Sequence, residues 1–383
     1  MATTFLTCGL LLSLPYLALS WQIVPHSHIS YSTVTGFFLQ DDPATNPTGF
    51  DYAKVNFGLI NQTYPTDASL PAHSGPRTQW QRFARYVKKL NKDALDNVTY
   101  KVLFLGRHGE GYHNAAESYY GTPAWNCYWS KLEGNGTAVW ADAKLTPDGV
   151  AQALEANAFW DSQMKNERMP APQSYYTSPL SRCLATAELT FSGLQLPAGR
   201  PFAPTIKEFL REGVHIHTSA RRASAAAIRD AYPIFKFEPG FPEGPDPLWN
   251  GTFGEDESAL RARSKIALDE IFTETETTWV SITSHSDEIA SLLSVLGHRP
   301  FGLSTGQVIP VLVKAERTYQ AYPSTTIRPW QSKATCTRPP ITSIPAVGCV
   351  CSGAPTATPT PMQLRSSSGS LPYGSLMDEK GGR

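Results

Sequence analysis

The chain has 383 residues, which is enough for one large domain or two smaller ones that each bury a hydrophobic core. Lysine and arginine together number 33, as do aspartate and glutamate, so the net charge near zero gives no support for a polyanion-binding or membrane-surface role. Charged residues make up only 17 % of the chain, while 28 glycines and 31 prolines favour a loop-rich globular protein over a helical bundle.

The first 20 residues, MATTFLTCGLLLSLPYLALS, have the composition of a secretory signal peptide. They carry no charged side chain, have an apolar centre from Leu10 to Leu19, and end in a small-x-small pattern at Ser20. A membrane anchor is the alternative, but the apolar run is too short to span a bilayer comfortably and Pro15 interrupts it. We therefore expect a secreted, extracellular glycoprotein. Four Asn-x-Ser/Thr sequons support export, and they begin at Asn61, Asn97, Asn135 and Asn250.

Five cysteines follow the predicted signal peptide, which itself contains Cys8. An odd number in an oxidising compartment leaves one thiol free or intermolecular. We assign this thiol to Cys183, which lies on a predicted buried helix, and expect Cys336 to pair with Cys349 or Cys351. No second pair or neighbouring histidine completes a zinc pattern around Cys349 and Cys351, and no metal is expected there.

Residues 21–97 are expected to form an N-terminal extension that packs on the main domain. Their one amphipathic stretch begins at Arg77 and places Trp80, Phe83, Val87 and Leu90 at helical spacing, which predicts a helix with one buried face. At the other end of the chain, residues 321–351 are expected to form a C-terminal extension. Residues 352–383 are rich in Pro, Thr, Ser and Gly and are predicted to be a disordered tail.

Residues 98–320 alternate strand-like and helix-like segments. Helices are predicted after Thr146 and Ser178, each an N-cap followed by proline, and from Asp287 to Gly297. This alternation predicts an α/β fold, a three-layer αβα sandwich with a mainly parallel central sheet. The Pro- and Gly-rich stretch Glu238–Trp249 is interpreted as a linker, or else as a loop over the site. The predicted strands are Tyr100–Leu105, Ser174–Thr177, Trp279–Thr283 and Val308–Lys314.

Candidate catalytic residues stand where three of these strands end. Arg107 and His108 follow the first, Arg182 lies in the first turn of the helix after the second, and His285 follows the third. Ligands of open α/β sheets bind outside the carboxyl ends of the strands. A histidine held in one tautomer can attack phosphorus, while arginine and helix N-termini attract phosphate. Each residue alone could be an ordinary loop histidine or surface arginine, but their coincidence predicts a phosphate site.

These motifs resemble those of the histidine phosphatase superfamily, on its phosphoglycerate mutase-like branch, over residues 100–316. RHGEGYHN is similar to the opening motif of that branch, SPLSRCLATAE to its second motif, and SHSDE to the segment with its second histidine. The phytase-like branch fits less well, because it has other residues where this chain has Glu110 and Ser286. The resemblance implies a phosphoglycerate mutase-like fold.

The resemblance also implies roles for single residues. His108 would be the nucleophile that forms a phosphohistidine. Arg107, Arg182 and His285 would hold the phosphoryl group and stabilise charge in the transition state. Asn114, six residues after the first histidine, would be a secondary pocket residue. The two arginines and the second histidine would supply the positive charge, so no metal or cofactor is expected.

The resemblance places the proton donor in KEFLREGVHIH. Glu212 is the better match there, and Glu208 is the reserve candidate. A general acid is needed because an alkoxide is a poor leaving group at neutral pH. The loop that follows departs from many relatives, since Thr218 and Ser219 stand where those carry an acidic and a basic residue.

The first hypothesis for function is a secreted phosphatase that hydrolyses a phosphomonoester through a phosphohistidine. A phosphoglycerate mutase-type phosphoryl transferase is the second, and export argues against it because its bisphosphate primer is intracellular. A catalytically silent binding module of the same fold is the third. The expected partner is a small-molecule phosphate ester, with neither nucleic acid nor a stable membrane association. The sequence does not identify the substrate or the oligomeric state.

Overall fold

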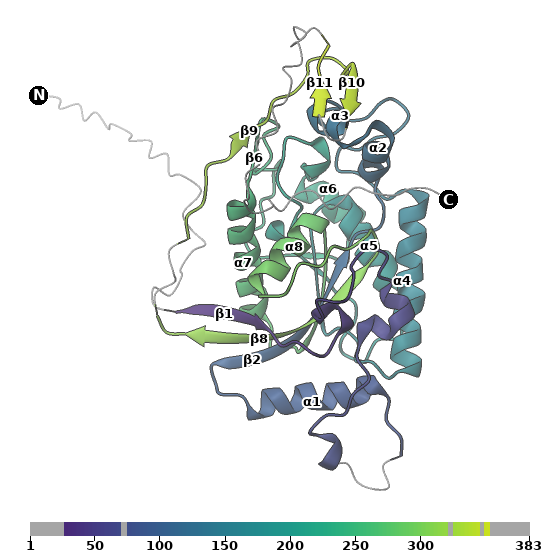
Figure 1. The fold of residues 1–383 in the computed structure, drawn as a ribbon, viewed down its shortest axis with the longest axis vertical. Coiled ribbons are helices and arrows are strands. Elements are labelled where there is room, and N and C mark those ends of the chain that lie inside the picture. The colour runs from purple at the N-terminus through teal and green to yellow at the C-terminus, as the bar shows by residue number, and fades with distance from the viewer. Residues whose placement is uncertain (1–26, 70–74, 321–324, 345–347, 353–383) are drawn as a thin grey trace, which may run out of the picture.

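A computed structural model of the protein describes residues 27–69, 75–320, 325–344 and 348–352 (Figure 1). The predicted signal peptide with Cys8, and nearly all of the predicted tail, lie outside the described residues. Within the described ranges, no helix combines the length and apolar character needed to cross a bilayer.

A seven-stranded sheet forms the centre of the molecule, in the order β1-β8-β2-β7-β3-β4-β5. Neighbours from β2 to β5 are parallel, β8 is antiparallel to β2, and β1 is antiparallel to β8. The predicted mainly parallel sheet is therefore confirmed. The strands are β1 (His28–Thr33), β2 (Val98–Arg107), β3 (Ser174–Thr177), β4 (Thr205–Ile206), β5 (Lys236–Phe237), β7 (Trp279–Ser284) and β8 (Val308–Thr318).

Both faces of this sheet are covered by helices. Val102 and Phe104 of β2 point into one hydrophobic cluster, while Leu103 and Leu105 point into another, as the two-residue period of a strand requires. Helices α1 (Gln79–Asp93), α4 (Pro147–Asn166) and α5 (Ser181–Phe191) contribute to the first cluster. Helices α7 (Glu257–Glu274) and α8 (Ser286–Val295) contribute to the second. This is the predicted three-layer αβα sandwich.

Smaller elements connect these layers. Further helices are α2 (Tyr112–Tyr120), α3 (Thr122–Cys127) and α6 (Ala225–Ala231). Two short antiparallel pairs join β6 (Phe253–Gly254) to β9 (Gln331–Ser332) and β10 (Thr342–Ile344) to β11 (Gly348–Val350). Short stretches of 3-10 helix occur at Leu39–Asp41, Tyr52–Gly58, Asp67–Ser69, Trp129–Lys131, Glu208–Leu210 and Thr218–Ala220.

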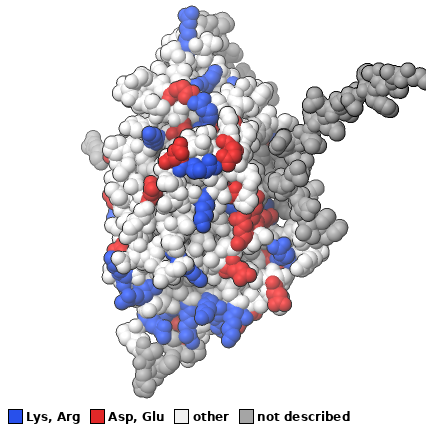
Figure 2. All heavy atoms as spheres, turned by 180° about the vertical axis from the view of Figure 1, so that it is seen from behind, with Lys and Arg blue, Asp and Glu red and all other residues white. Residues whose placement is uncertain are grey.

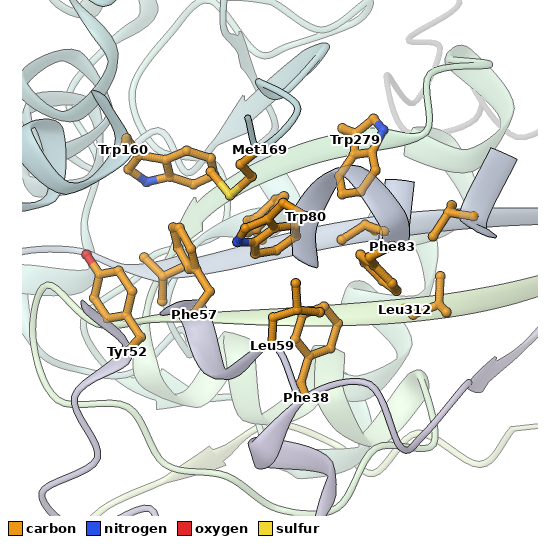
Figure 3. Close-up of a cluster of buried hydrophobic side chains, with 14 of the residues drawn as sticks. Phe38, Tyr52, Phe57, Leu59, Trp80, Phe83, Trp160, Met169, Trp279 and Leu312 are labelled. Atoms are coloured by element: carbon orange, nitrogen blue, oxygen red, sulfur yellow. The ribbon is translucent and has the colours of Figure 1, made fainter. Parts of the chain in front are cut away.

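An aromatic cluster joins the N-terminal segment to the sheet (Figure 3). The Phe57 ring lies 5.4 Å from Phe104 of β2 and 4.9 Å from Trp160 of α4, measured between centroids. Trp80, on the predicted amphipathic helix, lies 6.2 Å from Phe104 and 6.3 Å from Trp279 of β7. Buried aromatic side chains make large contributions to stability, so residues N-terminal to β2 supply one side of this core.

Helix α5 begins later than predicted. Its N-cap is Leu180, so the prediction that Ser178 caps the helix is wrong. The Ser178 hydroxyl lies 2.8 Å from Nε2 of His285, while the N–H of Ser181 at the start of α5 donates to Oδ1 of Asp142 at 2.9 Å. Asp142, from a distant loop, therefore binds the first N–H of α5, while the Ser178 hydroxyl accepts from the Leu180 N–H and contacts His285.

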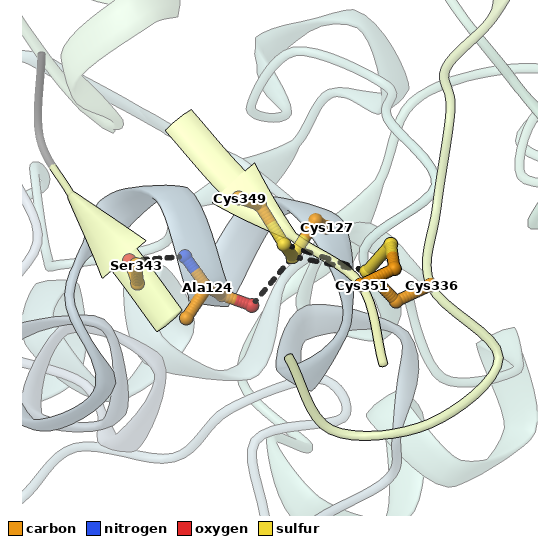
Figure 4. Close-up of a disulfide and its surroundings, with 6 residues drawn as sticks. All are labelled: Ala124, Cys127, Cys336, Ser343, Cys349 and Cys351. Atoms are coloured by element: carbon orange, nitrogen blue, oxygen red, sulfur yellow. Dashed lines mark hydrogen bonds between the residues drawn. A yellow bond between two sulfur atoms is a disulfide. The ribbon is translucent and has the colours of Figure 1, made fainter. Parts of the chain in front are cut away.

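Two disulfides hold the C-terminal segment (Figure 4). Cys336 pairs with Cys351, one of the two predicted partners, and Cys349 pairs with Cys127 of α3. Cys183 is buried and free, as predicted. Figure 1 shows β10 and β11 beside α3, at the opposite end of the molecule from α1. The disulfide between Cys127 and Cys349 therefore ties residues 348–352 to α3, which lies between β2 and β3 in the chain.

Charged side chains of both signs are interspersed over the middle of the face seen in Figure 2. Lys and Arg side chains gather at the lower end of this face, where α1 lies in Figure 1. Helix α1 carries three exposed lysines, Lys88, Lys89 and Lys92.

Candidate active site

The parallel arrangement of β2, β7 and β3 brings the predicted site residues together. Arg107 at the end of β2 pairs in register with Ser284 at the end of β7, so His108 and His285 follow adjacent positions. The two imidazole rings lie 5.0 Å apart between centroids, and the N–H of His108 donates to the Ser284 carbonyl at 3.0 Å. Glu212 joins them, with one side-chain oxygen or nitrogen of each of the three residues within 4.8 Å of the others.

His108 is held as a neutral imidazole with one nitrogen available. Its Nδ1 donates to the Gly109 carbonyl at 2.7 Å, which leaves the lone pair on Nε2. The ring is buried, and Nε2 has no hydrogen-bond partner among the residues that the structure describes. Burial, together with the charges of Arg182 and Arg107, keeps the pKa of His108 well below its usual range. A neutral imidazole with a free Nε2 can act as a nucleophile.

Two guanidinium groups flank the histidines. Arg107 donates from Nη1 to the Leu303 carbonyl at 2.7 Å, and Arg182 donates from Nη1 to the Ser219 carbonyl at 2.9 Å. These bonds fix each guanidinium, while Nε of both has no partner in the described part of the chain. Guanidinium N–H groups bind phosphoryl oxygens with charge-assisted hydrogen bonds, so both arginines have donors left for an anion.

His285 is the N-cap of α8 and lies beside His108 in the site. Its Nε2 lies 2.8 Å from the Ser178 hydroxyl and 3.3 Å from the Cys183 sulfur. Burial and then Arg182 and His108 hold the pKa of His285 well below its usual range. The α8 N-terminus that it caps supplies backbone N–H groups and a favourable dipole for an anion.

Glu212 is suited to donate and accept a proton near neutral pH. Its Oε1 accepts from the N–H groups of Gly213 and Asp287, each at 3.2 Å. The residue is half-buried, but the protein removes most water from its carboxyl group. This desolvation, followed by the nearby charge of Asp287, raises the pKa of Glu212 to about 7, although Arg182 and Arg107 oppose the shift. A carboxyl group with that pKa can act first as an acid and then as a base.

Glu208, the reserve candidate for the acid, lies apart from this cluster. It is buried, and its two oxygens accept from Arg211 and Arg222, each at 2.8 Å. Both oxygens therefore serve ion pairs and neither is left for a substrate. The geometry favours Glu212 in the role of proton donor.

His108, Glu212 and His285 are also residue types that bind divalent metal ions. Arg107 and Arg182 lie close enough for their charges to lower the pKa of both histidines. Two fixed positive charges beside the cluster oppose binding of a cation and favour an anion. The donor set therefore fits a phosphoryl group better than a metal ion.

The opening motif contributes a third histidine that the sequence analysis did not single out. The His113 ring is buried and lies 5.4 Å from His108 between centroids. Its neighbour Asn114 accepts at Oδ1 from the Gly111 N–H at 3.0 Å and so closes the N-terminus of α2. The role of Asn114 as a pocket residue stays a prediction. The signal that could have identified His113 is its place within the opening motif RHGEGYHN, in the part of the motif that forms the first turn of α2.

The Pro- and Gly-rich stretch Glu238–Trp249 is anchored rather than free, so its interpretation as a linker is wrong. Asp246 forms an ion pair with Arg211, and Arg222 donates to the Pro242 carbonyl at 3.0 Å. The indole N–H of Trp249 donates to the His217 carbonyl at 2.8 Å. These contacts tie the stretch to the segment that carries Glu212.

Comparison with known proteins agrees with this geometry. The sequence model of the histidine phosphatase superfamily (branch 1) matches residues 103–306, and the chain belongs to this superfamily. The resemblance stated from three motifs is thus confirmed, including its phosphoglycerate mutase-like side.

Two relatives match most of the chain. A protein of Arthroderma benhamiae named "Probable phosphoglycerate mutase" is 53% identical over 310 residues, which cover 81% of this chain and 91% of that protein. "Phosphomutase-like protein 3" of Candida albicans is 32% identical over 323 residues, with 83% and 89% covered. A solved structure of phosphoserine phosphatase from Entamoeba histolytica, in complex with 3-phosphoglyceric acid, has 20% identity and a TM-score of 0.31, with 55% of this chain and 94% of that chain covered.

Proposed function

We propose that the protein is a phosphatase that hydrolyses a small phosphomonoester through a phosphohistidine on His108. The observation that carries the proposal is the unpartnered Nε2 of a neutral His108, beside Glu212 and His285 and between two guanidinium groups. A buried nitrogen lone pair without a partner is unfavourable in the free protein and is satisfied when phosphorus binds there.

The first step transfers the phosphoryl group to the protein. The Nε2 lone pair of His108 forms a bond to phosphorus while the bond between phosphorus and the ester oxygen breaks. The proton of the Glu212 carboxyl group moves to the departing oxygen, which leaves as an alcohol. Arg107, Arg182 and His285 bind the three remaining phosphoryl oxygens as charge develops on them.

The second step releases phosphate. Water attacks phosphorus from the side that the alcohol has left, and the bond between phosphorus and Nε2 breaks. The Glu212 carboxylate takes a proton from the water and so returns to its starting state. His108 regains its lone pair, because the hydrogen bond from Nδ1 to Gly109 is kept throughout.

A phosphoglycerate mutase-type phosphoryl transferase is the second candidate, and the name of the relative with 53% identity favours it. A mutase returns the phosphoryl group of the phosphohistidine to a bound sugar acid instead of to water. It therefore needs a bisphosphate that primes the histidine. The two reactions share the first step and differ in what attacks the phosphohistidine.

An assay with a panel of phosphate esters, run with and without 2,3-bisphosphoglycerate, tests this choice. We expect inorganic phosphate to be released from several esters without the bisphosphate. Isomerisation of phosphoglycerate that depends on the bisphosphate and exceeds phosphate release would establish the mutase instead. A folded protein that does neither would be a silent binding module.

We further propose that the protein is secreted and glycosylated. Two disulfides support an oxidising compartment. Asn61, Asn135 and Asn250 are exposed, whereas Asn97 is half-buried and donates from Nδ2 to the Arg317 carbonyl of β8 at 3.1 Å.

Glycans are therefore expected at Asn61, Asn135 and Asn250 and at lower occupancy at Asn97. Peptide N-glycosidase treatment in heavy-oxygen water, followed by peptide mass spectrometry, measures occupancy at each site. Asn→Gln variants at the single positions are the controls. A secreted protein with no glycan at the three exposed positions, or with its main glycan at Asn97, would contradict this.

A further inference from the structure

Arg263 of α7 binds the main chain of the segment that carries Glu212. Its side chain is buried, and Nη1 donates to the carbonyls of Phe209 at 2.7 Å and Arg211 at 2.9 Å. Nη2 donates to the carbonyl of Glu212 itself at 3.3 Å. One guanidinium group therefore holds three carbonyl groups before and at Glu212, in the turn that presents the proposed acid.

The same guanidinium group is linked to the helix that holds the Glu212 carboxyl group. Nη1 donates to Oε2 of Glu288 on α8 at 3.2 Å. Glu288 directly follows Asp287, whose N–H donates to Oε1 of Glu212. Arg263 is thus connected to both ends of Glu212, to its backbone directly and to its carboxyl group through the first turn of α8.

Glu255 completes this buried network. It accepts from Nη2 of Arg263 at Oε1, at 2.6 Å, and from Nε at Oε2, at 3.3 Å. Its Oε1 also accepts from the N–H of Val214 at 2.7 Å, two residues after Glu212. The carboxylate therefore fixes the orientation of the guanidinium plane and binds the far side of the same turn.

We propose that Arg263 is a positioning residue that holds the Glu212 carboxyl group at the ester oxygen. This inference rests on the proposed function, because it concerns the proton given to the leaving group. Proton transfer needs hydrogen-bond distance between the acid and the departing oxygen, and a shift of about 1 Å in a positioned group can cost about 100-fold in rate. The planar fork of arginine serves six acceptor atoms on five residues here, whereas a lysine ammonium group has three donors on one atom.

The role predicts a dependence on the leaving group. An alkyl ester needs the proton of Glu212 when its oxygen departs, while p-nitrophenolate leaves without one. For Arg263→Lys we expect kcat/KM to fall about 10- to 100-fold more for an alkyl phosphate than for p-nitrophenyl phosphate. Because kcat/KM reports the steps up to phosphoryl transfer to His108, later attack by water does not affect the comparison. In Arg263→Lys/Glu212→Gln, the further loss on the alkyl ester should be small.

Arg222→Lys is the matched control. Arg222 is also buried, binds Glu208 and holds the carbonyls of Ala223 and Pro242, but it makes no described contact with Glu212. Its replacement should lower the melting temperature and change both esters by the same factor. Equal losses on both esters for Arg263→Lys would overturn the proposal and leave only a structural role.

Glu288→Leu keeps the test decisive if Arg263→Lys does not fold. This variant keeps a buried side chain of similar size and removes the acceptor that links Arg263 to α8. It should show the same leaving-group dependence with a smaller amplitude, and its absence would overturn the proposal. If the wild-type protein hydrolyses neither ester, the proposed function fails, and the role of Arg263 fails with it.

Discussion

Replacement of His108 by alanine is expected to abolish turnover of phosphate esters. Loss of a nucleophile that acts together with its partners costs roughly four to six orders of magnitude in kcat. The reason is geometric, since Nε2 of His108 is the unpartnered nitrogen between the two guanidinium groups. The measurement is kcat with p-nitrophenyl phosphate, together with acid-labile labelling of the protein by a radioactive phosphate ester.

His298→Ala is the matched control for this substitution. His298 is also buried, and its Nδ1 donates to the carbonyl of the next residue, Arg299, as Nδ1 of His108 donates to Gly109. It lies away from the site and contacts Asp41. Its loss should lower stability and leave turnover and labelling in place. A labelled His108→Ala protein, or one within tenfold of wild-type activity, would contradict the assignment of the nucleophile.

Glu212→Gln is expected to reduce kcat/KM for alkyl phosphates by roughly 100- to 10,000-fold, and to affect p-nitrophenyl phosphate much less. The wild-type protein needs Glu212 protonated in the first step. Because the pKa of Glu212 is raised to about 7, kcat/KM for alkyl esters should fall as pH rises above 7. Glutamine cannot titrate, so the variant should lose this limb of the pH profile. A limb that persists in the variant would assign it to another group.

The same carboxyl group should make stability depend on pH. The folded pKa of Glu212, about 7, exceeds its ordinary value of 4.5, so its protonated form favours folding. That contribution is complete below pH 4.5 and is lost as pH rises through 7. Glu212→Gln should therefore be more stable than wild type at pH 8, by about 1–3 kcal/mol in denaturant titrations. Glu208→Gln should be less stable, because it breaks two buried ion pairs.

The convergence of the candidate site residues could be predicted because these residues follow a rule of topology. His108, Arg182 and His285 each come just after an apolar strand, and the carboxyl ends of parallel strands share one edge of a sheet. The choice between the two glutamates could not be made in this way. It depends on the hydrogen bonds that Arg211 and Arg222 donate to the two Glu208 oxygens, and no local sequence pattern predicts these contacts. The network around Arg263 was missed for the same reason.

The parts of the fold that escaped prediction have equally physical causes. Strands β4 and β5 are two residues long, so they carry no periodicity that a sequence could display. The apolar run of β8 predicts a buried strand but does not state that it runs antiparallel to β2. The cap expected at Ser178 failed because α5 begins only at Ser181, whose N–H donates to Asp142, a residue 39 positions away that no local pattern identifies.

The aromatic cluster of the N-terminal segment limits how far the chain can be truncated for expression. The superfamily match covers residues 103–306, which leaves out Phe57, Trp80 and all of β8. A chain truncated to residues 103–306 would expose the Phe104 side chain, which Phe57 and Trp80 cover in the full chain, to water. It would also lack β8, so β2 would become an unpaired edge strand. Such surfaces promote aggregation. The candidate active-site residues therefore all lie within residues 103–306, but a longer chain must be expressed to obtain a soluble protein.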